Sequence, residues 1–154
     1  MMATVEDYWT GRIVRLIRLA HLALHMEGIP ILGSVVGKKI EQRMEPLDIH
    51  PATMDDARSI IEQSRYCAAG SRVCLPLFPG SVVTESVFID ELAEQMAAVK
   101  KARPVTKDQA VATLLQYPHN PLVISKVSGR YLEICRSEPE TCIYWKIRKT
   151  GLNR

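Results

Sequence analysis

The amino-acid sequence predicts a mainly α protein with a small β-hairpin, a form of the α+β class, and three observations support this prediction. Apolar residues recur at helical spacing in several segments, from residues 5–26 to residues 106–116. Two β-rich segments, at residues 122–127 and 130–134, follow each other around a Ser-Gly turn. The chain has 154 residues, of which 47% are hydrophobic, so a single domain can bury a substantial core.

The predicted N-terminal helix at residues 5–26 is amphipathic. Ile, Leu and Ala side chains form its apolar face, whereas arginines and histidines lie on another side. His21 and His25 are four residues apart and share one side, a spacing that two imidazoles can use to bind one metal ion, although no HExxH arrangement accompanies them. We expect this helix to pack against the core or to dock against a redox partner or larger complex, and its arginines would also allow it to lie on a membrane surface.

Prolines divide the chain after a short second helix, which we expect at residues 33–44. Pro46 and Pro51 then mark a linker. We therefore predict an N-terminal helical extension, residues 1–46, that serves as the docking segment, followed by a four-cysteine domain at residues 47–154.

Capping signals predict three more helices in the second part of the chain. Thr53 and Thr106 each have an Asp or Gln three residues later, which is the spacing of a capping box. A third helix is expected to begin near residues 84–86. Because the helix that begins at Thr53 should end shortly before Cys67, that cysteine is expected in the loop that follows.

The four cysteines of the chain form two pairs of identical spacing. Cys67 and Cys74 enclose six residues, and so do Cys135 and Cys142. On an unbroken helix two such cysteines would be about 10 Å apart, but the glycine of the first segment and the proline of the second favour loops that can fold back. We therefore predict that the four thiols form one metal or cofactor site.

Four thiolates suit either an iron–sulfur cluster or a zinc ion. Structural zinc sites usually take ligand pairs two to four residues apart, whereas wider loops suit the larger cluster, so a 4Fe–4S cluster is the preferred prediction. Short side chains at Gly70 and Ser71 would let backbone N–H groups approach the sulfides, and Arg72 and Arg136 would offset the negative charge of the cluster. Trp145 would shield the site from water. Zinc and four unrelated buried cysteines are the alternatives.

A resemblance supports the cluster. A helix precedes Cys67 and Cys74, residues 102–110 open a further helix, and the second cysteine pair follows. Over about residues 50–145 this order resembles that of small iron–sulfur, ferredoxin-like proteins of anaerobic bacteria and archaea. Those proteins usually have CxC or CxxC spacings, which this chain lacks. The resemblance implies electron transfer, with the four cysteines as cluster ligands.

The basic charge of the C-terminal part would allow the protein to bind nucleic acid. Residues 101–154 carry ten basic and four acidic side chains, in a chain of net charge +3. The order helix, short strand, helix and hairpin between Glu85 and Cys135 is also that of a winged-helix module, in which Lys126 and Arg130 would contact phosphate. A winged-helix nucleic-acid-binding redox regulator is therefore an alternative function.

Motifs for hydrolases and for nucleotide or dinucleotide binding are missing from the sequence, so we expect an electron-transfer or accessory protein rather than an enzyme. The sequence contains neither a secretory signal nor about 18 consecutive apolar residues, which favours a cytoplasmic protein with reduced cysteines. The predicted function is that of an electron-transfer iron–sulfur protein, a subunit or partner of a larger redox enzyme. A structural zinc-binding interaction protein is the other alternative.

Overall fold

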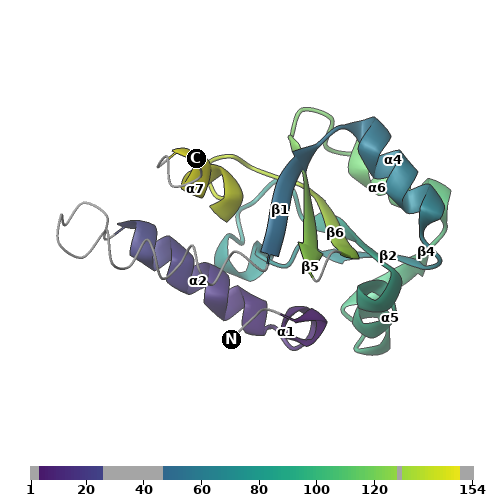
Figure 1. Ribbon diagram of the computed structural model, residues 1–154, viewed down its shortest axis with the longest axis horizontal. Helices are drawn as coiled ribbons and strands as arrows, with labels where there is room; N and C mark the ends of the chain where they lie inside the picture. Colours follow the sequence, from purple (N-terminus) through teal and green to yellow (C-terminus); the bar gives the residue numbers. More distant parts are fainter. Residues whose placement is uncertain (1–3, 26–46, 128–129, 150–154) are drawn as a thin grey trace.

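A computed structural model of the chain, which describes residues 4–25, 47–127 and 130–149, is organised around one six-stranded sheet (Figure 1). All of its neighbouring strands are antiparallel, and their spatial order is β1-β5-β6-β3-β2-β4. The strands are β1 (Leu47–Ala52), β2 (Cys67–Ser71), β3 (Glu85–Ile89), β4 (Ala102–Val105), β5 (Leu122–Val127) and β6 (Arg130–Arg136). The helices are α1 (Val5–Trp9), α2 (Arg12–His25), α4 (Met54–Gln63), α5 (Asp90–Ala98), α6 (Lys107–Leu115), α7 (Ile143–Lys149) and the 3₁₀ helix η2 (Leu75–Leu77).

The sheet shows that the predicted fold class, a mainly α protein with a small hairpin, is wrong. Three segments that we expected to be a linker, a loop and a helix start are the strands β1, β2 and β3. The small residues of β2 and Pro51 in β1 have low strand propensity. β2 forms a strand because it hydrogen-bonds to β3 on one side and β4 on the other. β1 tolerates Pro51 because it lies at the edge of the sheet.

The predicted hairpin is confirmed, but its position in the fold differs from that of a wing. β5 and β6 pair with each other, and they also pair with β1 and β3, respectively. The hairpin is therefore inside the sheet, so the winged-helix arrangement predicted for the C-terminal half is also wrong.

Local signals placed two helices correctly. Thr53 and Thr106 both cap helices through a complete capping box, at the start of α4 and α6. The N-terminal helix is interrupted at Gly11, whose φ of 82° suits glycine, and it forms the two helices α1 and α2. The helix predicted at residues 33–44 lies outside the described residues.

The two faces of the sheet carry separate cores. Because successive strand residues point to opposite faces, Cys67 and Ala68 belong to different clusters. Cys67 packs under α4 and α6, whereas Ala68 packs under α1, α2 and α5, and Figure 1 shows α2 and α4 on opposite sides of the sheet. The core on the α1–α2 side includes Tyr8, Ile13, Ala68, Phe88, Leu92, Ala93, Met96 and Leu132.

The N-terminal helices contribute to this core directly, through Tyr8 of α1 and Ile13 of α2.

Within the described ranges, none of the helices has both the length and the apolar character needed to cross a bilayer.

Candidate cysteine site

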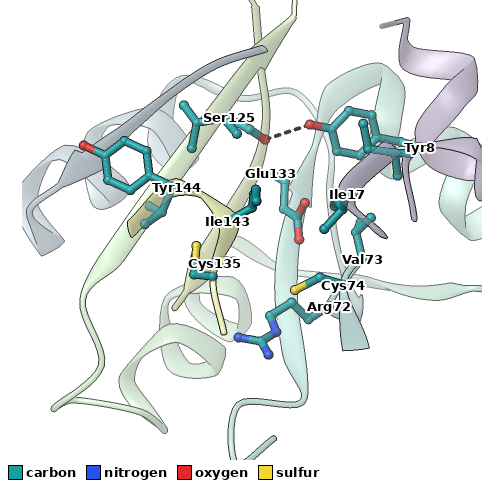
Figure 2. Close-up of a pocket in the computed structure, with 14 residues that line it drawn as sticks. Tyr8, Ile17, Arg72, Val73, Cys74, Ser125, Glu133, Cys135, Ile143 and Tyr144 are labelled. Atoms are coloured by element: carbon teal, nitrogen blue, oxygen red, sulfur yellow. Dashed lines mark hydrogen bonds between the residues drawn. The ribbon is translucent and has the colours of Figure 1, made fainter. Parts of the chain in front are cut away.

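A cavity of about 80 Å³ lies between the sheet and the helices α1, α2 and α7 (Figure 2). Its wall is mainly apolar, and the polar side chains in it come from α1, from the segments around the cysteines and from the strands β5 and β6. The lining residues are Tyr8, Ile13, Ile17, Ile49, Arg72, Val73, Cys74, Val123, Ser125, Glu133, Cys135, Cys142, Ile143 and Tyr144.

Three of the four cysteines line this cavity, and each comes from a different element. Cys135 lies in β6 opposite Val123 of β5, and both side chains point to the cavity face of the sheet. Cys74 immediately precedes η2, and Cys142 immediately precedes α7. Residues far apart in the sequence are thus brought to one place, as expected for part of the predicted site.

The structure does not bring the fourth cysteine to the cavity. Cys67 lies in β2 rather than in a loop, and its side chain points to the opposite face of the sheet. There it is 4% exposed, packs with Ala57 and Ile61 of α4, and has its sulfur 3.1 Å from the Ser64 hydroxyl oxygen. The structure therefore brings together a three-cysteine set and leaves Cys67 in the core.

Arg72 is the one residue that we expected around the cysteines and that also lines the cavity. Arg136 donates from Nε to the Leu114 carbonyl at 2.9 Å and from Nη1 to the Asn120 carbonyl at 2.9 Å, and therefore binds the end of α6. Trp145 donates from Nε1 to the Ser137 hydroxyl at 2.8 Å, between the last two cysteines.

Gly70 and Ser71, the two small residues that we expected beside a cluster, lie away from the cavity. Gly70 faces β4 so closely that a Cβ there would be 2.4 Å from the Lys101 carbonyl oxygen. Ser71 is exposed. Neither residue lines the cavity.

Burial raises the pKa of all three cavity thiols. The pKa of Cys74 rises to about 12, against a smaller opposing effect of Arg72. Burial and the nearby Glu133 carboxyl raise the pKa of Cys135 well above its usual value, and burial also raises the pKa of Cys142. At neutral pH these thiols are therefore protonated and weakly nucleophilic, and a metal that binds them must displace their protons.

The Arg72 guanidinium is buried beside the thiols, with its side chain 1% exposed. Its Nη2 donates to the Ser81 hydroxyl at 2.6 Å and to Glu138 at 3.3 Å. Its Nε is buried and has no hydrogen-bond partner within the part of the chain that the structure describes. A buried N–H group without an acceptor is rare in proteins, so this donor suits an acceptor in the cavity, such as a thiolate or an inorganic sulfide.

Glu133 brings a carboxyl group to the middle of the same cavity (Figure 2). It accepts a hydrogen bond from the Ser86 hydroxyl at 2.6 Å. Burial raises its pKa, more than that bond and the Arg72 charge lower it. Tyr8 donates to the Ser125 hydroxyl at 3.3 Å in the same wall, and its burial raises its pKa.

The two histidines of α2 differ in their surroundings. His25 is exposed, whereas the His21 ring packs edge-on against Phe78 with 5.1 Å between the ring centroids. Burial lowers the pKa of His21, as do the nearby Lys146 and His25. His21 therefore serves α2 packing in its neutral form.

The size and donor set of the cavity limit what it can bind. Pockets for organic ligands usually measure about 300–1,000 Å³, well above the volume found here, so a flavin or nucleotide does not suit it. Among residues 4–25, 47–127 and 130–149, no three His, Cys, Asp or Glu side chains are close enough to hold one metal ion. A tetrahedral zinc site would require the cysteines to move together, whereas a cluster of several metal atoms holds its thiolates further apart.

No protein-family model matches the chain, and no curated protein or solved structure has significant similarity to it. The resemblance to small iron–sulfur proteins therefore stays a prediction, and the function has to be inferred from the cysteine cavity.

Sequence reasoning missed Glu133 and Glu138 at this site. Glu133 is the only charged residue in the apolar segment Tyr131–Cys135, next to a cysteine, and that placement is a signal for a buried functional or structural carboxyl group. Glu138 gave no such signal, because it lies in a polar segment and its partner Arg72 is 66 residues away.

Proposed function

We propose that this protein binds an iron–sulfur cluster through Cys74, Cys135 and Cys142 and transfers electrons. One observation carries the proposal: three thiols from three separate elements surround one small apolar cavity, beside a buried guanidinium whose Nε–H has no acceptor among the described residues.

The chemistry of the donor set supports a cluster over other cofactors. Thiolates are soft ligands that iron–sulfur clusters prefer, and the protonated thiols found here would exchange their protons for metal. The positive charge of Arg72 and its free Nε–H would offset the negative charge of the thiolates and sulfides.

When bound, such a cluster supplies one-electron redox chemistry. The three cysteines would hold it, and the apolar side chains of α2 and α7 would form part of the wall around it. A 4Fe–4S cluster remains the preferred type, and with Cys67 on the other face of the sheet one of its positions would take a ligand other than cysteine. We expect the protein in the cytoplasm, where such cysteines stay reduced.

Metal analysis of single cysteine variants tests the proposal. The full chain is purified under anaerobic conditions, and its iron, zinc and acid-labile sulfide are measured together with its absorption spectrum. We expect a brown protein whose iron is lost in Cys74→Ser, Cys135→Ser and Cys142→Ser. Cys67→Ser is the matched control, and it should keep its iron and sulfide.

Two results would overturn the proposal. A colourless wild-type protein with one zinc ion and no sulfide would support a structural zinc site instead. Loss of iron in Cys67→Ser, to the same extent as in the other three variants and with the fold intact by circular dichroism, would reject the three-cysteine set.

A further inference from the structure

Two helices, α2 and α7, cover part of the cysteine cavity. Ile13 and Ile17 of α2, and Ile143 and Tyr144 of α7, contribute their inner sides to the cavity wall. The two helices contact each other and lie side by side along one edge of the molecule (Figure 1). Their outer sides therefore lie about one helix diameter, roughly 10–12 Å, from the cavity.

The outer side of α2 mixes arginines with leucines. Leu19 and Leu22 are 54% and 58% exposed, which is unusual for large apolar side chains on a helix that already buries another face. At 100° per residue, the exposed residues occupy less than half of the helix circumference. We call this surface the Arg–Leu face, and it consists of Arg12, Arg15, Arg18, Leu19, Leu22 and His25.

The charge on the two covering helices has one sign. α2 and α7 together carry six Lys and Arg residues and neither Asp nor Glu. By contrast, α5, beside the same face of the sheet, carries three acidic residues and no basic one. Arg12, Arg15 and Arg18 form no ion pair within the ranges that the structure describes.

We propose that the Arg–Leu face is the docking surface for an acidic redox protein that exchanges electrons with the cavity. The three arginines would attract and orient a negatively charged partner, and Leu19 and Leu22 would supply the apolar contact that completes an interface. The inference rests on the proposed function, because the face matters for electron transfer only if the cavity holds a redox group.

The mixture of charged and apolar residues on the Arg–Leu face favours a protein partner over a membrane surface. Helices that lie on membranes separate a broad apolar face, often with aromatic residues, from a basic face. In α2 the broad apolar face already packs on the sheet, and the exposed face interleaves two leucines with three arginines and has no aromatic residue. Such a face would not insert into lipid, but it suits the polar rim and small apolar centre of a transient protein interface.

Flavodoxin, a small acidic electron carrier, is a suitable probe. Its binding to the full chain is measured by fluorescence anisotropy, and electron transfer from its reduced form by anaerobic stopped-flow, both at low and at physiological salt. We expect binding that weakens as salt rises, because charge attraction is screened. Charge reversal in Arg15→Glu/Arg18→Glu should lower the association rate at least tenfold at low salt.

A charge-reversal control lies on the other face of the sheet. Arg58→Glu changes an exposed arginine of α4 and should leave the flavodoxin association rate within twofold of wild type. Reduction by dithionite, a small anion that needs no docking surface, should slow much less than reduction by flavodoxin in Arg15→Glu/Arg18→Glu. Circular dichroism and thermal unfolding establish that each variant is folded.

The binding measurement decides the docking proposal even if no cluster is found. Absence of salt-dependent flavodoxin binding, or an equal loss in Arg58→Glu, would overturn it. Co-sedimentation with phosphatidylserine vesicles is the third measurement: vesicle binding that Arg15→Glu/Arg18→Glu abolishes, without flavodoxin binding, would reject the protein partner in favour of a membrane.

Discussion

Arg72 and Glu138 form an ion pair that joins the two cysteine segments, with 3.3 Å between Nη2 and Oε2. Arg72 belongs to the segment that ends at Cys74, and Glu138 to the segment that ends at Cys142. The Ser81 hydroxyl contacts both side chains, and the Val82 N–H donates to the carboxylate at 2.9 Å. This network fixes the position of one cysteine relative to the other.

Removing the carboxylate charge should destabilise the protein substantially. Glu138→Gln would leave the Arg72 charge buried without a counter-charge, which costs about 3–5 kcal/mol in fully buried pairs. Because the Glu138 side chain is 17% exposed, we expect a cost below that range, about 2–3 kcal/mol. Urea unfolding of the apoprotein measures the change in the free energy of unfolding.

A surface ion pair in the same segment provides the control. Glu140 pairs with Lys149 at 3.7 Å, and both side chains are largely exposed. Glu140→Gln should therefore change the free energy of unfolding by less than about 1 kcal/mol. Equal effects of the two substitutions would mean that the Arg72–Glu138 pair does not hold the segments together.

The sequence predicted those parts of the fold whose signals are local. The capping boxes at Thr53 and Thr106 and the hairpin of β5 and β6 each depend on residues close together in the chain, and all are confirmed. β2 was missed because its residues do not favour a strand by themselves. Its strand state depends on pairing with β3 and β4, whose residues come later in the sequence.

The equal spacing of the cysteine pairs predicted only part of the site, because the position of Cys67 depends on strand pairing that local sequence does not show. Cys74, Cys135 and Cys142, from both pairs, line one cavity, but no three such side chains among the described residues are close enough to hold one metal ion. The spacing also implied that Cys67 and Cys74 are equivalent, which requires a loop between them. Because Cys67 lies in β2, the alternation of strand side chains places it on the opposite face.

The packing of α2 should depend on pH through His21. Burial, with Lys146 and His25 nearby, lowers the pKa of His21 below the usual 6.5. The unfolded chain then takes up a proton at higher pH than the folded protein. The contribution of neutral His21 to the free energy of unfolding is therefore present in full above about pH 6.5 and is lost as pH falls towards the folded pKa. Unfolding by urea at several pH values between 5 and 8 should show this loss.

Substitution of the two α2 histidines separates this effect from general acid sensitivity. His21→Gln should reduce the loss of stability between pH 6.5 and 5. His25→Gln, at an exposed position of the same helix, should keep most of the pH dependence of wild type, because burial is the largest cause of the lowered His21 pKa and His25 a smaller one. If His21→Gln also behaves like wild type, His21 does not control the docking of α2.

The close contact between β2 and β4 requires glycine at position 70. A Cβ on Gly70 would be 2.4 Å from the Lys101 carbonyl oxygen and 2.8 Å from the Ala102 Cα, both of which are backbone atoms. Gly70→Ala should therefore displace β4 and cost about 1–3 kcal/mol, as other overpacked sites do. Gly80→Ala, where no atom lies within 4 Å of the new Cβ, should change stability by about 0.5 kcal/mol or less. Urea midpoints of the two variants test this difference, and similar midpoints would contradict it.

Arg72→Lys tests the role of the guanidinium at the cavity. Lysine keeps the positive charge and can still pair with Glu138, but it has no Nε–H group at the position of the buried donor. If that N–H donates to a cluster sulfur, its loss should lower the reduction potential, because such bonds stabilise the more negative, reduced cluster. We expect a shift of several tens of mV, on the order of the 59 mV that a tenfold change in equilibrium represents for one electron. Potentiometric titration, with the iron content measured alongside, gives the shift.

The control for that shift is another buried arginine close to a cysteine. Arg136 directly follows Cys135 in β6, but its guanidinium binds the Leu114 and Asn120 carbonyls on the other side of the sheet. Arg136→Lys removes similar hydrogen bonds and keeps the charge, so it should disturb packing to a comparable degree. Because its N–H groups do not face the cavity, the potential should remain at the wild-type value. A shift of equal size in both variants would show that the potential responds to packing in general rather than to a hydrogen bond from Arg72.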